Sequence, residues 1–155
     1  MKNQIKEEIK PIIILMAEDD LDDQLLTKEA LTESLVVNDL YFVQDGVELM
    51  EYLQRKGKYA DKNTSPFPDL ILLDLNLPRM DGREALEKIK SDPSLKSIPI
   101  VVLTTSQAEE DIFRSYALGA SGFISKPVTF PELVKVMKTL GEYWVAVVKL
   151  PKKGN

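Results

Sequence analysis

Five short apolar segments alternate with longer segments of helical spacing along the chain, and this alternation limits the possible folds more than any other feature. Strands are expected at residues 12–16, 40–44, 69–74, 98–104 and 121–125. Helices are expected to follow them, beginning near residues 20, 45, 82, 106 and 129. Because nearly continuous apolar strands must be buried on both faces, the pattern predicts an α/β fold in which helices cover both faces of a five-stranded parallel sheet.

Local signals mark the starts of three of these helices. In each, an Asp, Ser or Thr is followed three residues later by Glu, which is typical of a capping box. The pairs are Asp45 with Glu48, Ser106 with Glu109, and Thr129 with Glu132. The first helix is indicated instead by leucines four residues apart, Leu21 with Leu25 and Leu31 with Leu35.

Length and composition limit the chemistry. The 155 residues, 44% of them apolar, are enough for one compact domain, which we expect to span 1–155. The chain contains no cysteine and no histidine, which excludes disulfides, thiolate nucleophiles, imidazole bases and imidazole metal ligands. Any reaction must therefore use carboxylates, hydroxyls and amines.

Charge and hydropathy favour a protein or small-molecule partner. The net charge is −5 and Lys and Arg do not cluster, so neither nucleic acid nor an anionic membrane is an expected partner. No segment has the roughly 18 uninterrupted apolar residues of a membrane span, and the first residues do not resemble a signal peptide. We therefore expect a soluble, cytoplasmic protein.

Polar side chains gather where the predicted strands end. The carboxyl ends of parallel strands share one edge of the sheet, where α/β proteins bind ligands. The residues expected there are Glu18, Asp19, Asp20, Asp74, Thr104, Thr105, Ser125 and Lys126. Singly, each has an ordinary explanation, such as a helix cap for Asp20 or a solvated amine for Lys126. Together, Glu18, Asp19 and Asp74 would repel one another, and a divalent cation such as Mg²⁺ would remove that cost.

Four motifs at these strand ends resemble the receiver domain of two-component response regulators. They are "EDD" (18–20), "DLNLPRMDG" (74–82), "LTTS" (103–106) and "SKP" (125–127), and the resemblance covers roughly residues 10–141. It implies a flavodoxin-like sheet of strand order 2-1-3-4-5. It also implies that the protein accepts a phosphoryl group from a sensor histidine kinase.

The resemblance assigns a role to each matched residue. Asp74 is the implied phosphoacceptor, and Lys126 the amine that pairs with the phosphoryl group; the peptide that joins it to Pro127 is usually cis in the family. The implied Mg²⁺ ligands are Asp19 directly, Glu18 through water, Asp74 and the backbone carbonyl of Asn76. Thr104 is the implied switch hydroxyl. Phe123 stands where the family has a mobile aromatic residue, and it is read equally well as a core residue.

Other features are similar to the stand-alone regulators of phytochrome histidine kinases. A C-terminal extension (142–155) carries several apolar residues, and in that group the last helix and tail pair two copies. A homodimer is therefore expected; the alternative is a tail packed on its own domain. With no output domain expected, the signal would pass by protein contact. The protein would not be a conventional enzyme, since it would catalyse only its own Mg²⁺-dependent phosphorylation and dephosphorylation.

Three other functions are less favoured. A phosphatase of the Asp-x-Asp type needs a second acid at position 76, which is Asn here. A docking module that is never phosphorylated would not need Asp74, Thr104 and Lys126 together. A flavin-binding protein would need a Gly, Ser or Thr-rich phosphate loop after the first strand, and none is present.

Overall fold

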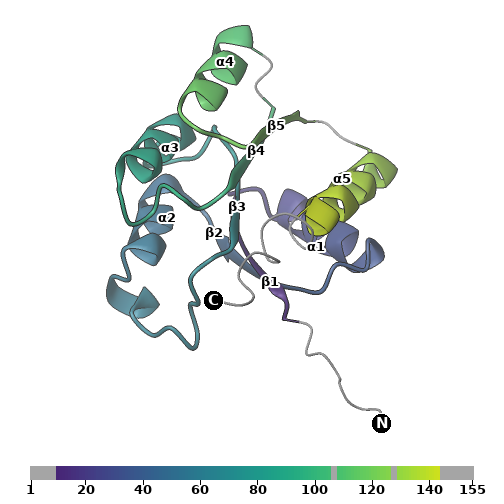
Figure 1. Ribbon diagram of the computed structural model, residues 1–155, viewed down its shortest axis with the longest axis horizontal. Coiled ribbons are helices and arrows are strands. Elements are labelled where there is room, and N and C mark those ends of the chain that lie inside the picture. Colours follow the sequence, from purple (N-terminus) through teal and green to yellow (C-terminus); the bar gives the residue numbers. More distant parts are fainter. Residues whose placement is uncertain (1–9, 106–107, 127–128, 144–155) are drawn as a thin grey trace, which may run out of the picture.

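The computed structural model describes residues 10–105, 108–126 and 129–143 (Figure 1). The strands are β1 (Ile12–Ala17), β2 (Asn38–Val43), β3 (Leu70–Leu73), β4 (Ile100–Thr104) and β5 (Gly122–Ser125). The helices are α1 (Leu21–Glu33), α2 (Gly46–Leu53), α3 (Gly82–Ser91), α4 (Glu109–Ala117) and α5 (Phe130–Tyr143), with a short 3₁₀ helix, η2 (Gly57–Tyr59). The alternation predicted from the sequence is confirmed.

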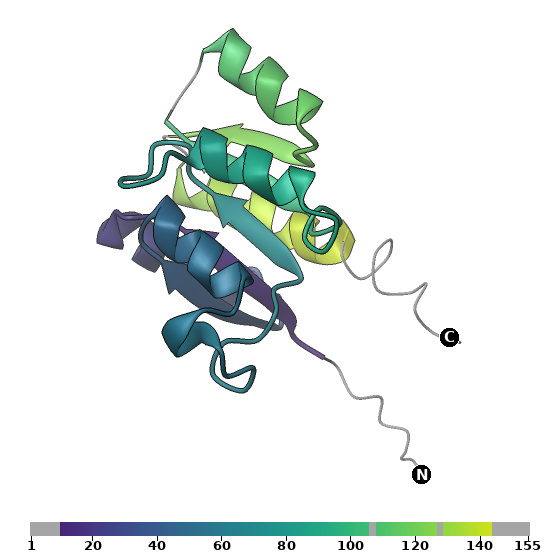
Figure 2. The same ribbon diagram turned by 90° about the vertical axis from the view of Figure 1, so that its left-hand side faces the viewer.

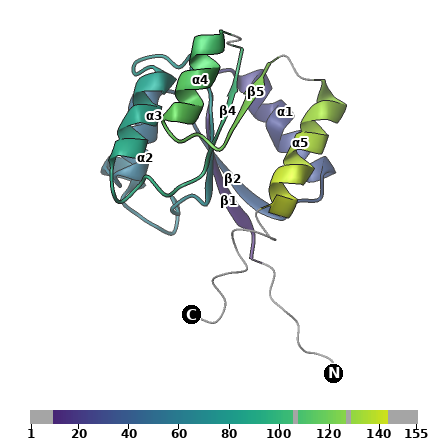
Figure 3. The same cartoon turned by 45° about the horizontal axis from the view of Figure 1, so that its top comes forward.

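The five strands form one parallel sheet in the order β2-β1-β3-β4-β5, as expected. Helices α1 and α5 cover one face, and α2, α3 and α4 cover the other (Figures 1 and 3). Figure 2 shows α2 and α3 in front of the sheet and α5, in yellow, behind it. Of the helices in the described ranges, none is long and apolar enough to cross a bilayer.

Each face of the sheet has its own hydrophobic core. The core beneath α2 and α3 includes Leu15, Leu49, Ile71, Leu86 and Ile89. The core beneath α1 and α5 includes Ile14, Leu31, Leu72, Leu133 and Met137. Successive side chains of one strand therefore pack into opposite cores, which is why β1, β3 and β4 are apolar almost throughout.

Of the three predicted capping boxes, the one at Thr129 is confirmed; at Asp45 the N-cap is confirmed, but the Glu48 side chain bonds the amide one residue before it. The Glu48 amide donates to Asp45 Oδ1 at 2.7 Å, and the Glu48 side chain accepts from the Gln44 amide. Thr129 and Glu132 bond reciprocally, at 3.0 and 3.3 Å. The fourth helix differs from the prediction, because its N-cap is Ala108, which has no capping side chain; Ser106 lies outside the described residues.

The leucine pattern predicted α1 correctly but not its buried face. Leu21 and Leu25 are 63% and 55% exposed, and Leu35 lies beyond the end of the helix. The buried residues of α1 are Thr27 and, three and four residues later, Ala30 and Leu31. This face of α1 packs against α5 and the core beneath it.

Candidate functional site

Three carboxylates meet at the carboxyl ends of β1 and β3. These strands are neighbours in register, with Ala17 opposite Leu73, so the next residues, Glu18 and Asp74, lie side by side. Glu18, Asp19 and Asp74 each offer an oxygen atom, and these atoms all lie within 4.8 Å of one another. The predicted acidic cluster is therefore brought together by the sheet itself.

Backbone contacts fix the orientation of Glu18. Its side chain is 1% exposed and accepts a hydrogen bond from the Asp20 amide at 3.1 Å. The Glu18 carbonyl accepts from the Gln24 side chain at 2.7 Å. Asp20 accepts from the amides of Asp22 and Asp23, so it is the N-cap of α1, which is the ordinary explanation for this acid.

Lys126 follows β5 and reaches across the sheet end into the acids. Its ammonium lies 2.7 Å from Glu18, 2.8 Å from Asp23 and 3.4 Å from Asp74. Burial raises the pKa of Glu18 to about 7, although the hydrogen bond from Lys126 acts in the opposite direction. Burial lowers the pKa of Lys126, but the hydrogen bonds to Asp23 and Glu18 outweigh it and raise that pKa above its ordinary value. Lys126 therefore stays charged.

The two oxygens of Asp74 have different partners. Oδ1 accepts from the Thr104 hydroxyl at 2.8 Å and from the Asn76 amide at 3.0 Å, whereas Oδ2 faces Lys126. The Asn76 side-chain amide donates to the hydroxyls of Thr104 and Thr105. These contacts hold the Asp74 carboxylate in one orientation at the end of a rigid, buried strand.

Phe123 lies on β5 and is partly buried. It packs against the small cluster of Leu75, Val102 and Ala120, and Leu75 is the residue that follows Asp74. Both readings made from the sequence, switch and core residue, stay predictions. The peptide between Lys126 and Pro127 lies outside the described residues.

The loop after Asp74 is held by two contacts that sequence reasoning missed. Gly82 packs directly on the backbone of Asp74 and Leu75, and its amide donates to the Leu75 carbonyl at 2.9 Å. Arg83 donates to the same carbonyl at 3.4 Å and forms a two-point ion pair with Asp111 on α4. Neither the glycine nor the arginine after it belongs to a local pattern from which such contacts could be inferred.

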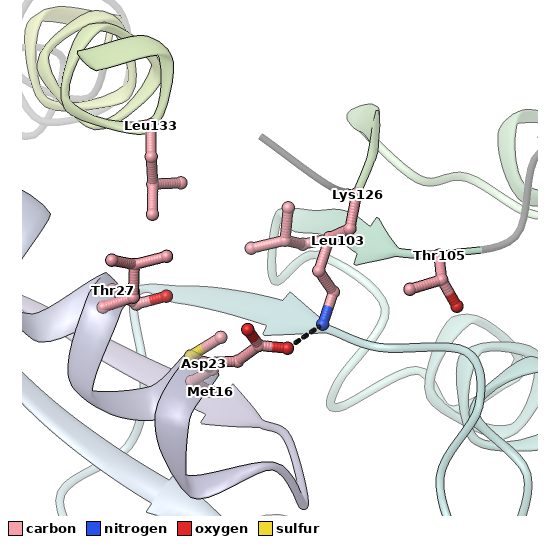
Figure 4. Close-up of a pocket in the computed structure, with 8 residues that line it drawn as sticks. Met16, Asp23, Thr27, Leu103, Thr105, Lys126 and Leu133 are labelled. Atoms are coloured by element: carbon pink, nitrogen blue, oxygen red, sulfur yellow. Dashed lines mark hydrogen bonds and ion pairs between the residues drawn. The ribbon is translucent and has the colours of Figure 1, made fainter. Parts of the chain in front are cut away.

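A cavity of about 270 Å³ adjoins Lys126, between α1, α5 and the ends of β1 and β4 (Figure 4). Its walls include Met16, Thr27, Leu103 and Leu133, and Lys126 crosses it to reach Asp23. Asp23 accepts a hydrogen bond from Lys126 but was not among the site residues predicted from the sequence. Only the fold brings it to a lysine 103 residues away.

The donor set suits a hard divalent cation. The cluster offers carboxylate oxygens alone, two of the three side chains are buried, and the chain has no histidine or cysteine to favour a softer metal. Glu18, Asp19 and Asp74 are the residues that could hold such an ion. The Asn76 backbone amide donates to Asp74 Oδ1. That the Asn76 carbonyl oxygen is a metal ligand stays a prediction.

A parallel α/β sheet whose strand ends bring together three carboxylates, a lysine and a threonine has the arrangement of a receiver-type signalling domain, and the comparisons show that family. Residues 14–138 match the response regulator receiver domain, and the chain belongs to that family. Receiver domains bind divalent metal ions at such sites.

Similar proteins of known sequence or structure include phytochrome regulators. The response regulator Rcp1 of Synechocystis sp. is 43% identical over 141 residues, which cover 91% of this chain and 94% of that protein. The phosphorylated cyanobacterial phytochrome response regulator RcpA is 46% identical, with a TM-score of 0.81 over 92% of this chain and 99% of that one. The Mn²⁺-bound form of Rcp1 is 42% identical, with a TM-score of 0.78 over 91% and 99%.

Proposed function

We propose that Asp74 accepts a phosphoryl group from a sensor histidine kinase and that the phosphorylated domain signals by protein contact. The observation that carries this proposal is the convergence on one buried carboxylate of Lys126, Thr104 and two further acids. An ionised carboxylate at the end of a strand is a nucleophile that needs no general base. The absence of histidine from the chain is therefore no obstacle.

In the proposed reaction, an oxygen of Asp74 bonds to phosphorus while the phosphorus–nitrogen bond of the kinase phosphohistidine breaks, and the electron pair leaves with the histidine nitrogen. The transferring group carries most of its charge on its outer oxygens, so positioning and positive charge supply the catalysis. Lys126 supplies an ammonium on one side. Mg²⁺ held by Glu18, Asp19, Asp74 and the Asn76 carbonyl would neutralise part of the remaining charge.

The same residues support a switch. The Thr104 hydroxyl already donates to Asp74, so a phosphoryl group there would become its new acceptor. Phe123 packs against the cluster that contains Leu75, the residue after the phosphoacceptor, so a shift at Asp74 could reach the α4–β5–α5 face through this aromatic ring. Dephosphorylation by water would end the signal, and the chain would catalyse only these two steps on itself.

We further propose a phytochrome kinase as the partner and a homodimer as the assembly. The first proposal is supported by the relatives, because Rcp1 and RcpA are about 43% to 46% identical and RcpA is a phytochrome response regulator. The second is supported by the α4–β5–α5 face, where Phe113 and Tyr116 are exposed and a cavity of about 410 Å³ lies beside edge strand β5. The proposed organisation is one receiver domain with an extension at 142–155.

The proposed function is tested with acetyl phosphate as the phosphoryl donor. With Mg²⁺ present, the chain should gain one phosphoryl group, about 80 Da by intact mass. A chelator should prevent the gain, and Asp19→Asn should slow it strongly because one carboxylate ligand is lost. A chain that gains no mass at any Mg²⁺ concentration would contradict the proposed function.

The proposed dimer is tested by truncation after Gly141. We expect the shortened chain to associate more weakly, because it would lose the apolar tail that is proposed to pair two copies. Sedimentation of the full and shortened chains, at equal concentrations, measures the effect. The same mass for both would favour a tail that packs on its own domain.

A further inference from the structure

We propose that Asp23 is a positioning residue for the reaction at Asp74: its carboxylate holds the Lys126 ammonium on the α1 side of the site and competes with the phosphoryl group for it. This inference rests on the proposed function. Asp23 belongs to none of the motifs by which the site residues were found in the sequence.

The first argument is the division of the Lys126 ammonium among its acceptors. An ammonium has three N–H donors, and three carboxylates surround this one. The contacts with Glu18 and Asp23 are 2.7 and 2.8 Å long, whereas the contact with Asp74 is 3.4 Å long. In this state the lysine is bound more closely to two other acids than to the phosphoacceptor.

The second argument separates Asp23 from Glu18. Glu18 and Asp74 both belong to the group of acids whose oxygens lie within 4.8 Å of one another, and that group does not contain Asp23. A divalent cation there would balance charge on Glu18 and Asp74 but would leave the charge of Asp23 for Lys126. Asp23 is therefore the acid that would still hold the ammonium when the metal site is filled.

The third argument is the position of Asp23 on its helix. It is the third residue of α1, where an acidic side chain commonly turns back to the N-cap amide. Here the Asp20 amide donates to Glu18 instead, and the Asp23 side chain lies toward Lys126, as Figure 4 shows. Asp22, one residue earlier, is exposed and no contact of its side chain with Lys126 is present.

Asp22 therefore provides a matched control. Asp23→Asn and Asp22→Asn remove the same charge from the same turn of α1, so both reduce the general repulsion of an incoming anion. Only Asp23→Asn releases Lys126. The side chains of Asp23 and Lys126 are 33% and 11% exposed, so solvent screens the pair in part and the expected effect is moderate.

The experiment measures the rate of phosphoryl gain from acetyl phosphate by intact mass. Mg²⁺ is saturating for every variant, so that a changed metal affinity does not alter the rates. We expect Asp23→Asn to be labelled about three to five times faster than Asp22→Asn. In a Lys126→Gln background, followed for longer times, the two variants should be labelled at equal rates, because the competition has been removed. Melting temperatures verify that each variant is folded.

Each result decides the proposal. Equal rates for the two variants, or a slower rate for Asp23→Asn, would overturn the role of Asp23 and leave the proposed function intact. A rate difference that persists in the Lys126→Gln background would also overturn it, because the effect would not act through the lysine. A wild-type chain that is not labelled would overturn the proposed function and this inference together.

Discussion

Asp74→Asn is expected to lose phosphoryl labelling completely while keeping the fold. A neutral side-chain amide is not a nucleophile at neutral pH, so no acyl phosphate can form at this position. The amide oxygen can still accept from the Thr104 hydroxyl and the Asn76 amide, because it replaces Oδ1 without a change of shape. Intact mass after incubation with acetyl phosphate and Mg²⁺ measures the loss.

Asp39→Asn is the matched control for this substitution. Asp39 is an exposed acid near the amino end of β2, at the opposite end of the strands from the site, and its replacement removes the same charge. It should be labelled at the wild-type rate. A label that persists in Asp74→Asn would place the acceptor on a neighbouring acid, and mapping of the labelled peptide would distinguish 17–23 from the loop after β3.

The fold was predictable from sequence because burial on both faces gives the central strands a distinctive apolar sequence. Strands β1, β3 and β4 are buried on both faces, so they are apolar without interruption and stand out from the amphipathic helices. Edge strand β2 was less well defined: it begins at Asn38, two residues before the prediction. An edge strand is half open to solvent and accepts Asn38 and Asp39, which no apolar pattern includes.

The strand order, in contrast, came from the resemblance to receiver domains. Periodicity places strands along the chain and does not say which of them are neighbours in the sheet.

The site was predictable where its residues follow directly from strand ends. Glu18, Asp74, Thr104 and Lys126 each lie at the end of a strand or immediately after it, and parallel strands bring such residues together. Contacts made through a helix were not predictable in this way. Asp23 on α1 meets Lys126, and Arg83 on α3 meets Asp111 on α4, because of how these helices are placed in the fold. Their sequence separations of 103 and 28 residues follow no local rule.

Gly82→Ala should produce a large loss of stability. A Cβ at position 82 would lie 2.2 Å from the Asp74 carbonyl oxygen and 2.6 Å from Leu75 Cα, and backbone atoms cannot move aside as a side-chain end can. Alanine has the better helix propensity, by about 1 kcal/mol, so propensity alone predicts stabilisation at this first residue of α3. We expect the steric cost to exceed it and to lower the free energy of unfolding by about 2 to 3 kcal/mol.

Urea unfolding measures this change, and Gly122→Ala is its control. The nearest atoms to a Cβ at position 122 are methyl carbons of Val101 at 3.7 Å, an ordinary contact, so that variant should stay within about 1 kcal/mol of wild type. Because relief of the Gly82 clash must displace the backbone of Asp74, Gly82→Ala should also be labelled more slowly, whereas Gly122→Ala should not. A Gly82→Ala chain as stable as wild type would mean that α3 can move away from the strand end, and that the position of Asp74 does not depend on this contact.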